Sequence, residues 1–147
     1  MDPWMFRPGL TEVVMECRGK NLFFTTDCVT PVNQADIVFI AVNTPTKYQG
    51  LGAGRAADLS MAQAAARSVA RACSRDTIVV EKSTVPVKTA EAIEAILTAN
   101  AQPGVSFQVL SNPEFLAEGT AIDDLSDPDR VLIGGRQSSA GLQAIGK

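Results

Sequence analysis

The sequence has 147 residues, which is enough for one domain with a hydrophobic core. Its residues are 46% hydrophobic and 20% charged, as in soluble globular proteins, and the formal net charge of -3 gives no basic excess that would attract nucleic acid or an anionic membrane. No apolar run approaches the roughly 20 residues that a membrane span requires. The first residues have neither the basic nor the apolar part of a signal peptide, so we expect a cytoplasmic location.

The reactive side chains are limited in kind. There is no histidine, so acid–base chemistry would depend on Asp, Glu, Lys or water. The three cysteines are odd in number and form no CxxC pair, which indicates neither a disulfide framework nor a zinc site. Cys17 and Cys73 fall on apolar helix faces and are predicted to be core residues, whereas Cys28 is predicted to lie in a loop. We expect no metal site.

The first part of the chain predicts two short helices and one well-defined strand. Apolar residues at helical spacing predict a helix over residues 10–17, which Gly19 would end. A short β-like run follows at residues 22–25. Thr30-Pro31 favours the start of a helix that continues through residue 35. Residues 36–42 are almost entirely apolar, which is typical of a strand buried on both faces.

The rest of the chain continues this alternation after a loop rich in Thr, Pro and Gly at residues 43–56. The further predicted elements are helices at residues 57–74 and 86–99 and strands at residues 77–81, 107–110 and 130–134. Strands that alternate with helices of this length predict parallel βαβ units. We therefore predict an α/β protein with one Rossmann-like parallel sheet and crossover helices.

Three of the predicted strands are followed by hydroxyl or amide side chains and then by a proline. These segments are residues 43–47, 82–86 and 111–119. The carboxyl ends of parallel strands meet at one edge of a sheet, where ligands bind, and helix N-termini at that edge suit phosphate groups. A single Thr-Pro or Asn-Pro is more often a helix cap than a site, but three at successive strand ends favour a binding site.

Glu114 and Glu118 are the candidates for acid–base chemistry at this edge. They are four residues apart, so a helical turn would place both carboxylates on one face. Such a pair is usually a solvated surface, although the apolar neighbours Phe115 and Leu116 favour a desolvated carboxylate that can act as a base. No GxGxxG follows a predicted strand, and we interpret the glycine-rich residues 50–54 as a flexible connector.

Five segments resemble, in order, the eukaryotic UDP-glucose 6-dehydrogenases of the UDP-glucose/GDP-mannose dehydrogenase family. They are Val42-Asn43-Thr44-Pro45-Thr46, Gly54-Arg55-Ala56-Ala57-Asp58-Leu59, Glu81-Lys82-Ser83-Thr84-Val85-Pro86-Val87, residues 111–121 and residues 128–135. The resemblance extends from about Pro8 to Gly135. It implies an NAD-dependent enzyme that oxidises the C6 hydroxyl of UDP-glucose to the carboxylate of UDP-glucuronate and reduces two NAD per turnover.

The resemblance also implies roles for individual residues. The implied NAD-binding residues are Val42, Asn43, Thr44, Pro45, Thr46, Ser83, Thr84, Val85 and Glu118. The implied substrate-binding residues are Glu114, Phe115, Leu116, Ala117 and Glu118. Thr84 would lie near the reacting sugar, and Glu114 would act in acid–base catalysis and thioester hydrolysis. Glu114 and Thr84 are therefore the predicted catalytic residues.

Several parts of the family's pattern have no match in residues 1–147: the GxGxxG turn, the ribose-binding acid, the nucleophilic cysteine in its Gly-rich context, and the catalytic lysine and asparagine. Cys17, Cys28 and Cys73 do not fit the context of that cysteine. We therefore interpret residues 1–147 as a partial NAD-binding domain that lacks the first βαβ unit, the helical dimerisation segment and the C-terminal UDP-binding domain, and we expect it to be inactive alone.

The alternative is a non-catalytic α/β module that packs on a full-length subunit. The family implies a homo-oligomer for the full-length enzyme, and the oligomeric state of this chain stays open. We expect UDP-glucose as the small-molecule partner, and neither a nucleic acid nor a membrane.

Overall fold

The computed structural model describes residues 8–117 and 119–146. The chain forms two compact units, each of which is built from two separate stretches. The first, which we call the helical unit, comprises Met1–Thr26 and Glu114–Val131. The second, which we call the sheet unit, comprises Asp27–Pro113 and Leu132–Lys147.

The sheet unit is built around three parallel strands, β1 (Ile37–Ile40), β2 (Thr77–Glu81) and β3 (Phe107–Ser111), in the order β1-β2-β3. The register places Ile37 opposite Ile78, and both strand pairs are parallel. All five residues of β2 are buried, as expected for a central strand of a parallel sheet. The prediction of an α/β protein with a parallel sheet is therefore confirmed.

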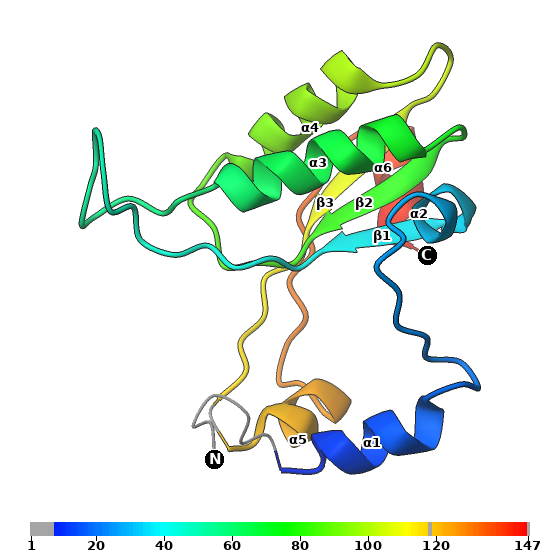
Figure 1. The fold of residues 1–147 in the computed structure, drawn as a ribbon, viewed down its shortest axis with the longest axis vertical. Coiled ribbons are helices and arrows are strands. Elements are labelled where there is room, and N and C mark those ends of the chain that lie inside the picture. The colour runs from blue at the N-terminus through cyan, green and yellow to red at the C-terminus, as the bar shows by residue number, and fades with distance from the viewer. Residues whose placement is uncertain (1–7, 118, 147) are drawn as a thin grey trace. The chain divides into compact units, whose positions relative to one another are not determined.

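Helices cover both faces of this sheet (Figure 1). The crossover helices α3 (Ser60–Ala72) and α4 (Thr89–Asn100) lie on one face, and α6 (Ser139–Ile145) lies on the other. The short helix α2 (Thr30–Gln34) precedes β1. Of these helices, α6 was not among the predicted elements.

Alternation along β2 divides the core between the two faces. Val79 packs with Ile93 and Leu97 of α4 on one side, whereas Ile78 and Val80 pack with residues of β3 and α6 on the other. The buried residues of α3 are small: Ala62, Ala66, Val69 and Ala70. Small side chains let this helix lie close to its neighbours in the core, above all to α4, which explains the alanine-rich pattern of the sequence.

The helical unit contains α1 (Leu10–Cys17) and α5 (Ala121–Ser126). No residue of α1 is buried, although its apolar positions form the predicted face. Cys17 is half-buried, so its prediction as a core residue is wrong, because too little of the chain covers α1. The predictions for the other two cysteines are confirmed, since Cys73 is buried and Cys28 is exposed.

The predicted strand at residues 130–134 does not form among the described residues. Over residues 130–134, only Gly134 pairs, in an isolated antiparallel bridge with Ser111 whose two N–H···O distances are both 2.8 Å. Val131 is 63% exposed. Residues 130–134 therefore have too few backbone hydrogen bonds to form a strand, and the two glycines at the end of the run, Gly134 and Gly135, weaken strand formation further. Similarly, the run at residues 22–25 forms one bridge, at Leu22.

Some element boundaries also differ from those predicted. β1 is shorter than residues 36–42, and β3 is one residue longer than 107–110. The second crossover helix does not start at Pro86, because the N–H and the hydroxyl of Thr89 both donate to the Pro86 carbonyl, at 3.2 and 2.7 Å, and close a turn there. Within this turn Lys88 has a φ of 71°, a left-handed conformation that delays the helix to Thr89.

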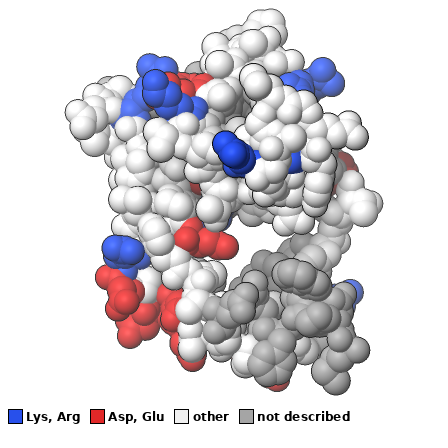
Figure 2. All heavy atoms as spheres, turned by 90° about the vertical axis from the view of Figure 1, so that its left-hand side faces the viewer, with Lys and Arg blue, Asp and Glu red and all other residues white. Residues whose placement is uncertain are grey.

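On the face shown in Figure 2, Lys and Arg side chains lie in small separate groups, whereas several Asp and Glu side chains gather in the lower part of the view. Within the described part of the chain, no helix has the length and apolar character that crossing a membrane would need.

Leu97 offers a test of the core between α4 and the sheet. It is 0% exposed, so Leu97→Ala should lower the free energy of unfolding by about 2–5 kcal/mol through lost apolar burial and a residual cavity. Leu51 is 98% exposed, and Leu51→Ala should change that free energy by less than about 0.5 kcal/mol. Urea denaturation of both variants measures the difference, and equal losses would contradict this packing.

Candidate functional site

The carboxyl ends of β1 and β2 lie side by side and are held together beyond the strand ladder by Ser83. The Lys82 N–H donates to the Ile40 carbonyl at 2.9 Å, and the Val42 N–H donates to the Ser83 hydroxyl oxygen at 3.1 Å. The same hydroxyl lies 3.5 Å from the Ile40 carbonyl. Ser83 therefore continues the pairing of the two strands after their regular ladder ends.

A second hydroxyl connects the segments that follow these strands. The Thr44 hydroxyl donates to the Thr84 carbonyl at 2.8 Å. This bond and the bond between Val42 and Ser83 bring together the two predicted cofactor-binding segments, residues 42–46 and 83–85. We call their shared edge the rim.

The loop after the first of these segments is hydrogen-bonded along its length. Thr46 bridges Ala57, and the Gly54 N–H donates to the Lys47 carbonyl at 2.8 Å. The Asp58 carboxylate accepts the Ser60 N–H at 2.9 Å, which holds the pKa of Asp58 below its usual value and marks the start of α3. The glycine-rich residues 50–54 are thus a turn at the end of a paired arm.

The hydroxyl, amide and backbone groups of the rim are donors and acceptors of the kind that the hydroxyls and carboxamide of a nicotinamide dinucleotide can pair with. No glycine-rich turn for the diphosphate follows a strand among residues 8–117 and 119–146. These described residues also contain no group of three or more Cys, Asp or Glu side chains placed to hold a metal ion.

Glu81, the last residue of β2, is a feature of the site that the sequence interpretation missed. It is 0% exposed, and neither carboxylate oxygen has a hydrogen-bond partner among the described residues. Burial raises the pKa of Glu81. A glutamate ending an otherwise apolar strand was the available signal. Its position places a buried carboxyl group directly before the rim.

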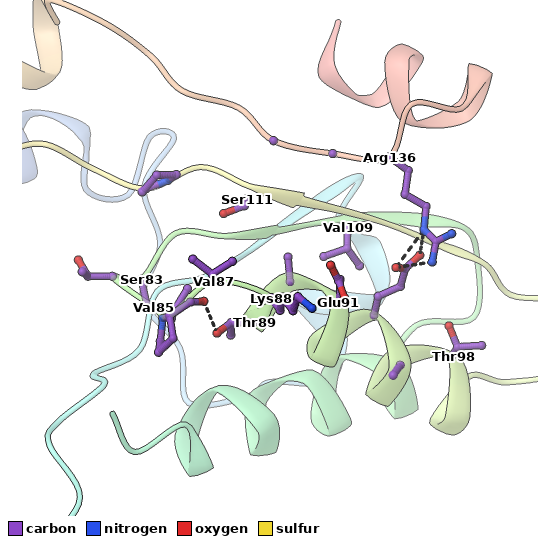
Figure 3. A pocket seen from close by; sticks show the side chains of 18 of the residues that line it. Ser83, Val85, Val87, Lys88, Thr89, Glu91, Thr98, Val109, Ser111 and Arg136 are labelled. Carbon is purple, nitrogen blue, oxygen red and sulfur yellow. Dashed lines mark hydrogen bonds and ion pairs between the residues drawn. The ribbon is translucent and has the colours of Figure 1, made fainter. Parts of the chain in front are cut away.

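An open groove of about 1010 Å³ lies along α4 and β3 (Figure 3). Its lining includes Ser83, Thr84 and Val85 but no residue of the segment 42–46, so it coincides with only one half of the rim. Figure 3 shows Arg136 directed toward α4, and its Nε atom lies 2.8 Å from Oε1 of Glu94. This ion pair raises the pKa of Arg136.

The predicted substrate residues Glu114, Phe115, Leu116 and Ala117 belong to the helical unit, and we call them the substrate segment. Residues 112–117 have no regular secondary structure, so no helical turn includes Glu114 within them. Glu118 lies outside the described residues, and a shared face for the two carboxylates stays a prediction. In place of a turn, Asn112 N–H donates to the Glu81 carbonyl at 2.9 Å. Glu114 is exposed. The structure thus brings the cofactor residues together at the rim and carries the substrate segment in the other unit.

Two residues that contact the substrate segment were also missed. Asp124 accepts a hydrogen bond from the Ala117 N–H at 2.9 Å, and the Arg130 guanidinium lies 4.6 Å from the centroid of the Phe115 ring. Asp124 could have been recognised as an acidic residue in the first turn of a helix. The sequence carries no comparable signal for Arg130.

A parallel sheet with crossover helices and polar segments after its strand ends defines a Rossmann-type nucleotide-binding domain. Solved structures agree with this class. The UDP-glucose dehydrogenase of the archaeon Pyrobaculum islandicum matches 95% of this chain with a TM-score of 0.78 and 36% identity, over 32% of its own length. The GDP-mannose dehydrogenase of Pseudomonas aeruginosa, solved as a ternary complex, matches 95% with a TM-score of 0.80 and 30% identity, also over 32% of its length.

Residues 3–146 match the NAD binding domain of the UDP-glucose/GDP-mannose dehydrogenase family, and the chain belongs to this family. NAD is accordingly the cofactor of the domain. The chain is 64% identical to UDP-glucose 6-dehydrogenase 3 of Oryza sativa subsp. japonica over 99% of its length, and 66% identical to UDP-glucose 6-dehydrogenase 1 of Glycine max over 96%. It spans 31% and 29% of these two relatives, or about a third of each.

Glu81 makes the stability of the sheet unit depend on pH. Because its pKa is raised above the ordinary 4.5 in the folded chain, the unfolded chain loses this proton first as pH increases. The free energy of unfolding should therefore fall with rising pH from about 4.5 until the folded-state pKa is passed. In Glu81→Gln the contribution of this carboxyl group to the pH dependence should be absent. Urea denaturation of the parent and the variant across that pH range measures the difference in the free energy of unfolding.

The matched control is Glu91→Gln, at an exposed glutamate of α4, which should leave that fall in place. An unchanged pH dependence in Glu81→Gln would show that the carboxyl of Glu81 does not titrate differently in the two states.

Proposed function

We propose that this chain supplies the cofactor-binding part of an enzyme that oxidises UDP-glucose to UDP-glucuronate, with water as the oxygen source and two NAD reduced per turnover. The observation that supports it most directly is the rim, where hydroxyls tie together the two segments that the family resemblance assigns to NAD. Sequence identity of 64–66% to UDP-glucose 6-dehydrogenases supports the choice of substrate.

The residues of the rim would hold and orient the nicotinamide end of the cofactor. Ser83 keeps the ends of β1 and β2 in register, and Thr44 fixes the backbone at Thr84, so that Thr84 is presented from a constrained segment. The bound cofactor would accept hydride from the sugar. A rigid rim helps because hydride transfer depends on the distance and the angle between the two reacting carbons.

Glu114 is the proposed acid–base residue. The oxidation of an alcohol requires removal of the hydroxyl proton, and in a chain without histidine a carboxylate is a suitable acceptor. Phe115, Leu116 and Ala117 would contact the sugar nucleotide next to it.

A second candidate function is the non-catalytic module that packs on a full-length subunit. It is favoured by the position of β1 at the edge of the sheet and by its Phe39, which is 57% exposed. A strand edge and an exposed aromatic ring suit packing against another polypeptide. Both candidates expect the isolated chain to be inactive.

A completed enzyme separates the two candidates. We define it as the rice relative in which residues 8–146 of this chain replace the matching segment. The isolated chain should form no NADH with UDP-glucose and NAD, because it holds no match to the nucleophilic cysteine and lysine. The completed enzyme should form NADH at a rate within about tenfold of the rice enzyme. A folded but inactive hybrid would favour the non-catalytic module.

Glu114→Gln tests the proposed base in the completed enzyme. The change keeps the size of the side chain but removes its proton affinity, so kcat should fall by roughly 10²–10⁴-fold while KM for NAD changes little. Steady-state NADH formation measures both constants. Glu12→Gln, at an exposed glutamate of the same unit, is the control and should retain the parent kcat. A parent-like rate in Glu114→Gln would remove Glu114 from catalysis.

A further inference from the structure

The backbone of the substrate segment is held at Ala117 by a carboxylate from α5. Asp124 Oδ2 accepts the Ala117 N–H at 2.9 Å and the Thr120 hydroxyl at 3.0 Å. A charged acceptor makes such bonds stronger than bonds between neutral groups. The irregular backbone at Ala117 is thereby attached to a helix.

A turn at Gly119 makes this attachment possible. Gly119 has a φ of 89°, in the left-handed region, and lies in a turn directly before α5. Ala121, the first residue of α5, is buried, and the Asp124 N–H donates to the Thr120 carbonyl at 2.9 Å. A side chain at Gly119 would strain this turn, so the path that returns Asp124 to Ala117 depends on glycine.

The ring of Phe115 is held by a second residue, Arg130. The guanidinium lies 4.6 Å from the ring centroid, within the range of cation–π interactions. Among the described residues Arg130 forms no ion pair with a carboxylate. Phe115 is 51% exposed, so the guanidinium adds a contact to a side chain that is only partly covered by the rest of the chain.

We propose that Asp124 and Arg130 are positioning residues for the sugar-nucleotide substrate: Asp124 holds the backbone at Ala117, and Arg130 holds the ring at Phe115. Two anchors two residues apart restrict the intervening Leu116 and the adjoining Glu114 to one orientation. The inference rests on the proposed function, because orientation of this segment affects catalysis only if the segment binds the substrate.

A merely structural role would have different consequences. Loss of a surface contact that only stabilises the fold lowers the melting temperature and the fraction of active enzyme, without selecting one substrate. The proposed cofactor residues of the rim lie in the sheet unit, whereas Asp124 and Arg130 lie in the helical unit. A positioning role should therefore raise KM for UDP-glucose more than KM for NAD.

The contact itself can be measured in the 147-residue chain. Amide hydrogen exchange observed by NMR should be at least about tenfold faster at Ala117 in Asp124→Ala than in the parent chain. Asp124→Asn keeps an acceptor oxygen and should restore part of the protection. Asp123→Ala is the matched control, because Asp123 is exposed and no hydrogen bond of its side chain occurs within the described part of the chain. Equal exchange in parent and Asp124→Ala would overturn the proposal.

The consequence for catalysis is measured in the completed enzyme. Asp124→Ala should raise KM for UDP-glucose roughly tenfold, the effect of losing one charge-assisted hydrogen bond, and leave KM for NAD within about threefold of the parent value. Arg130→Gln should raise KM for UDP-glucose by a smaller factor, about threefold, and Arg130→Lys, which keeps a cation over the ring, should recover part of that loss. Asp123→Ala should keep the parent constants.

The outcomes separate the inference from the proposed function. The activity of the completed enzyme without further substitutions tests the proposed function. If that enzyme is inactive, both the proposed function and the inference are overturned. Hydrogen exchange at Ala117 reports on the contact with Asp124 in either case. If the completed enzyme is active, an unchanged KM for UDP-glucose in Asp124→Ala overturns the inference alone. An equal rise in both KM values, with a lower melting temperature, also overturns it, because it indicates a structural role.

Discussion

Burial of β2 on both faces is the constraint on which the rest of the sheet unit depends. Its side chains alternate between the two faces, so each face needs its own cover: α3 and α4 pack over Val79, and α6 packs over Ile78 and Val80. Its backbone groups need strands on both sides, which β1 and β3 supply. Because the pairing is parallel, each connection must cross over, and the carboxyl ends of the strands meet at one edge. The rim is a consequence of this arrangement.

At the end of β2, stability favours an apolar residue, whereas the candidate site has a glutamate. An apolar residue at position 81 would complete the buried strand, since a buried carboxylate without partners destabilises a fold. Glu81 stands there instead, immediately before Lys82 and Ser83. Ionisable groups with shifted pKa values concentrate at functional sites, which fits the assignment of the following residues to cofactor binding. The groove along α4 shares Ser83, Thr84 and Val85 with the rim but contains no residue of the segment 42–46.

In both units the candidate functional backbone is irregular and is held by side chains. Ser83 and Thr44 hold the rim through hydroxyl groups, and Asp124 and Arg130 hold the substrate segment through a carboxylate and a guanidinium. Irregular backbone has no repeating hydrogen bonds to define its path. Side-chain contacts therefore fix its conformation, as backbone hydrogen bonds do within a sheet. The residues that give a loop its geometry are thus often not the residues that would touch a ligand.

The sequence by itself determined the fold class, the central strand and the composition of the rim. The apolar run at residues 77–81 predicted β2 without error, because a strand buried on both faces needs little information beyond its own residues. Tertiary structure decided what depends on partners distant in the chain. Residues 130–134 have the composition of a strand but pair only at Gly134. The apolar face of α1 is left unburied by the part of the chain that the structure describes. Lys88 adopts a left-handed conformation in the turn that Thr89 closes on Pro86. The burial of Glu81 and the contacts of Asp124 and Arg130 were likewise decided in three dimensions, because a side chain's neighbours and its distance from water are properties of the packed chain.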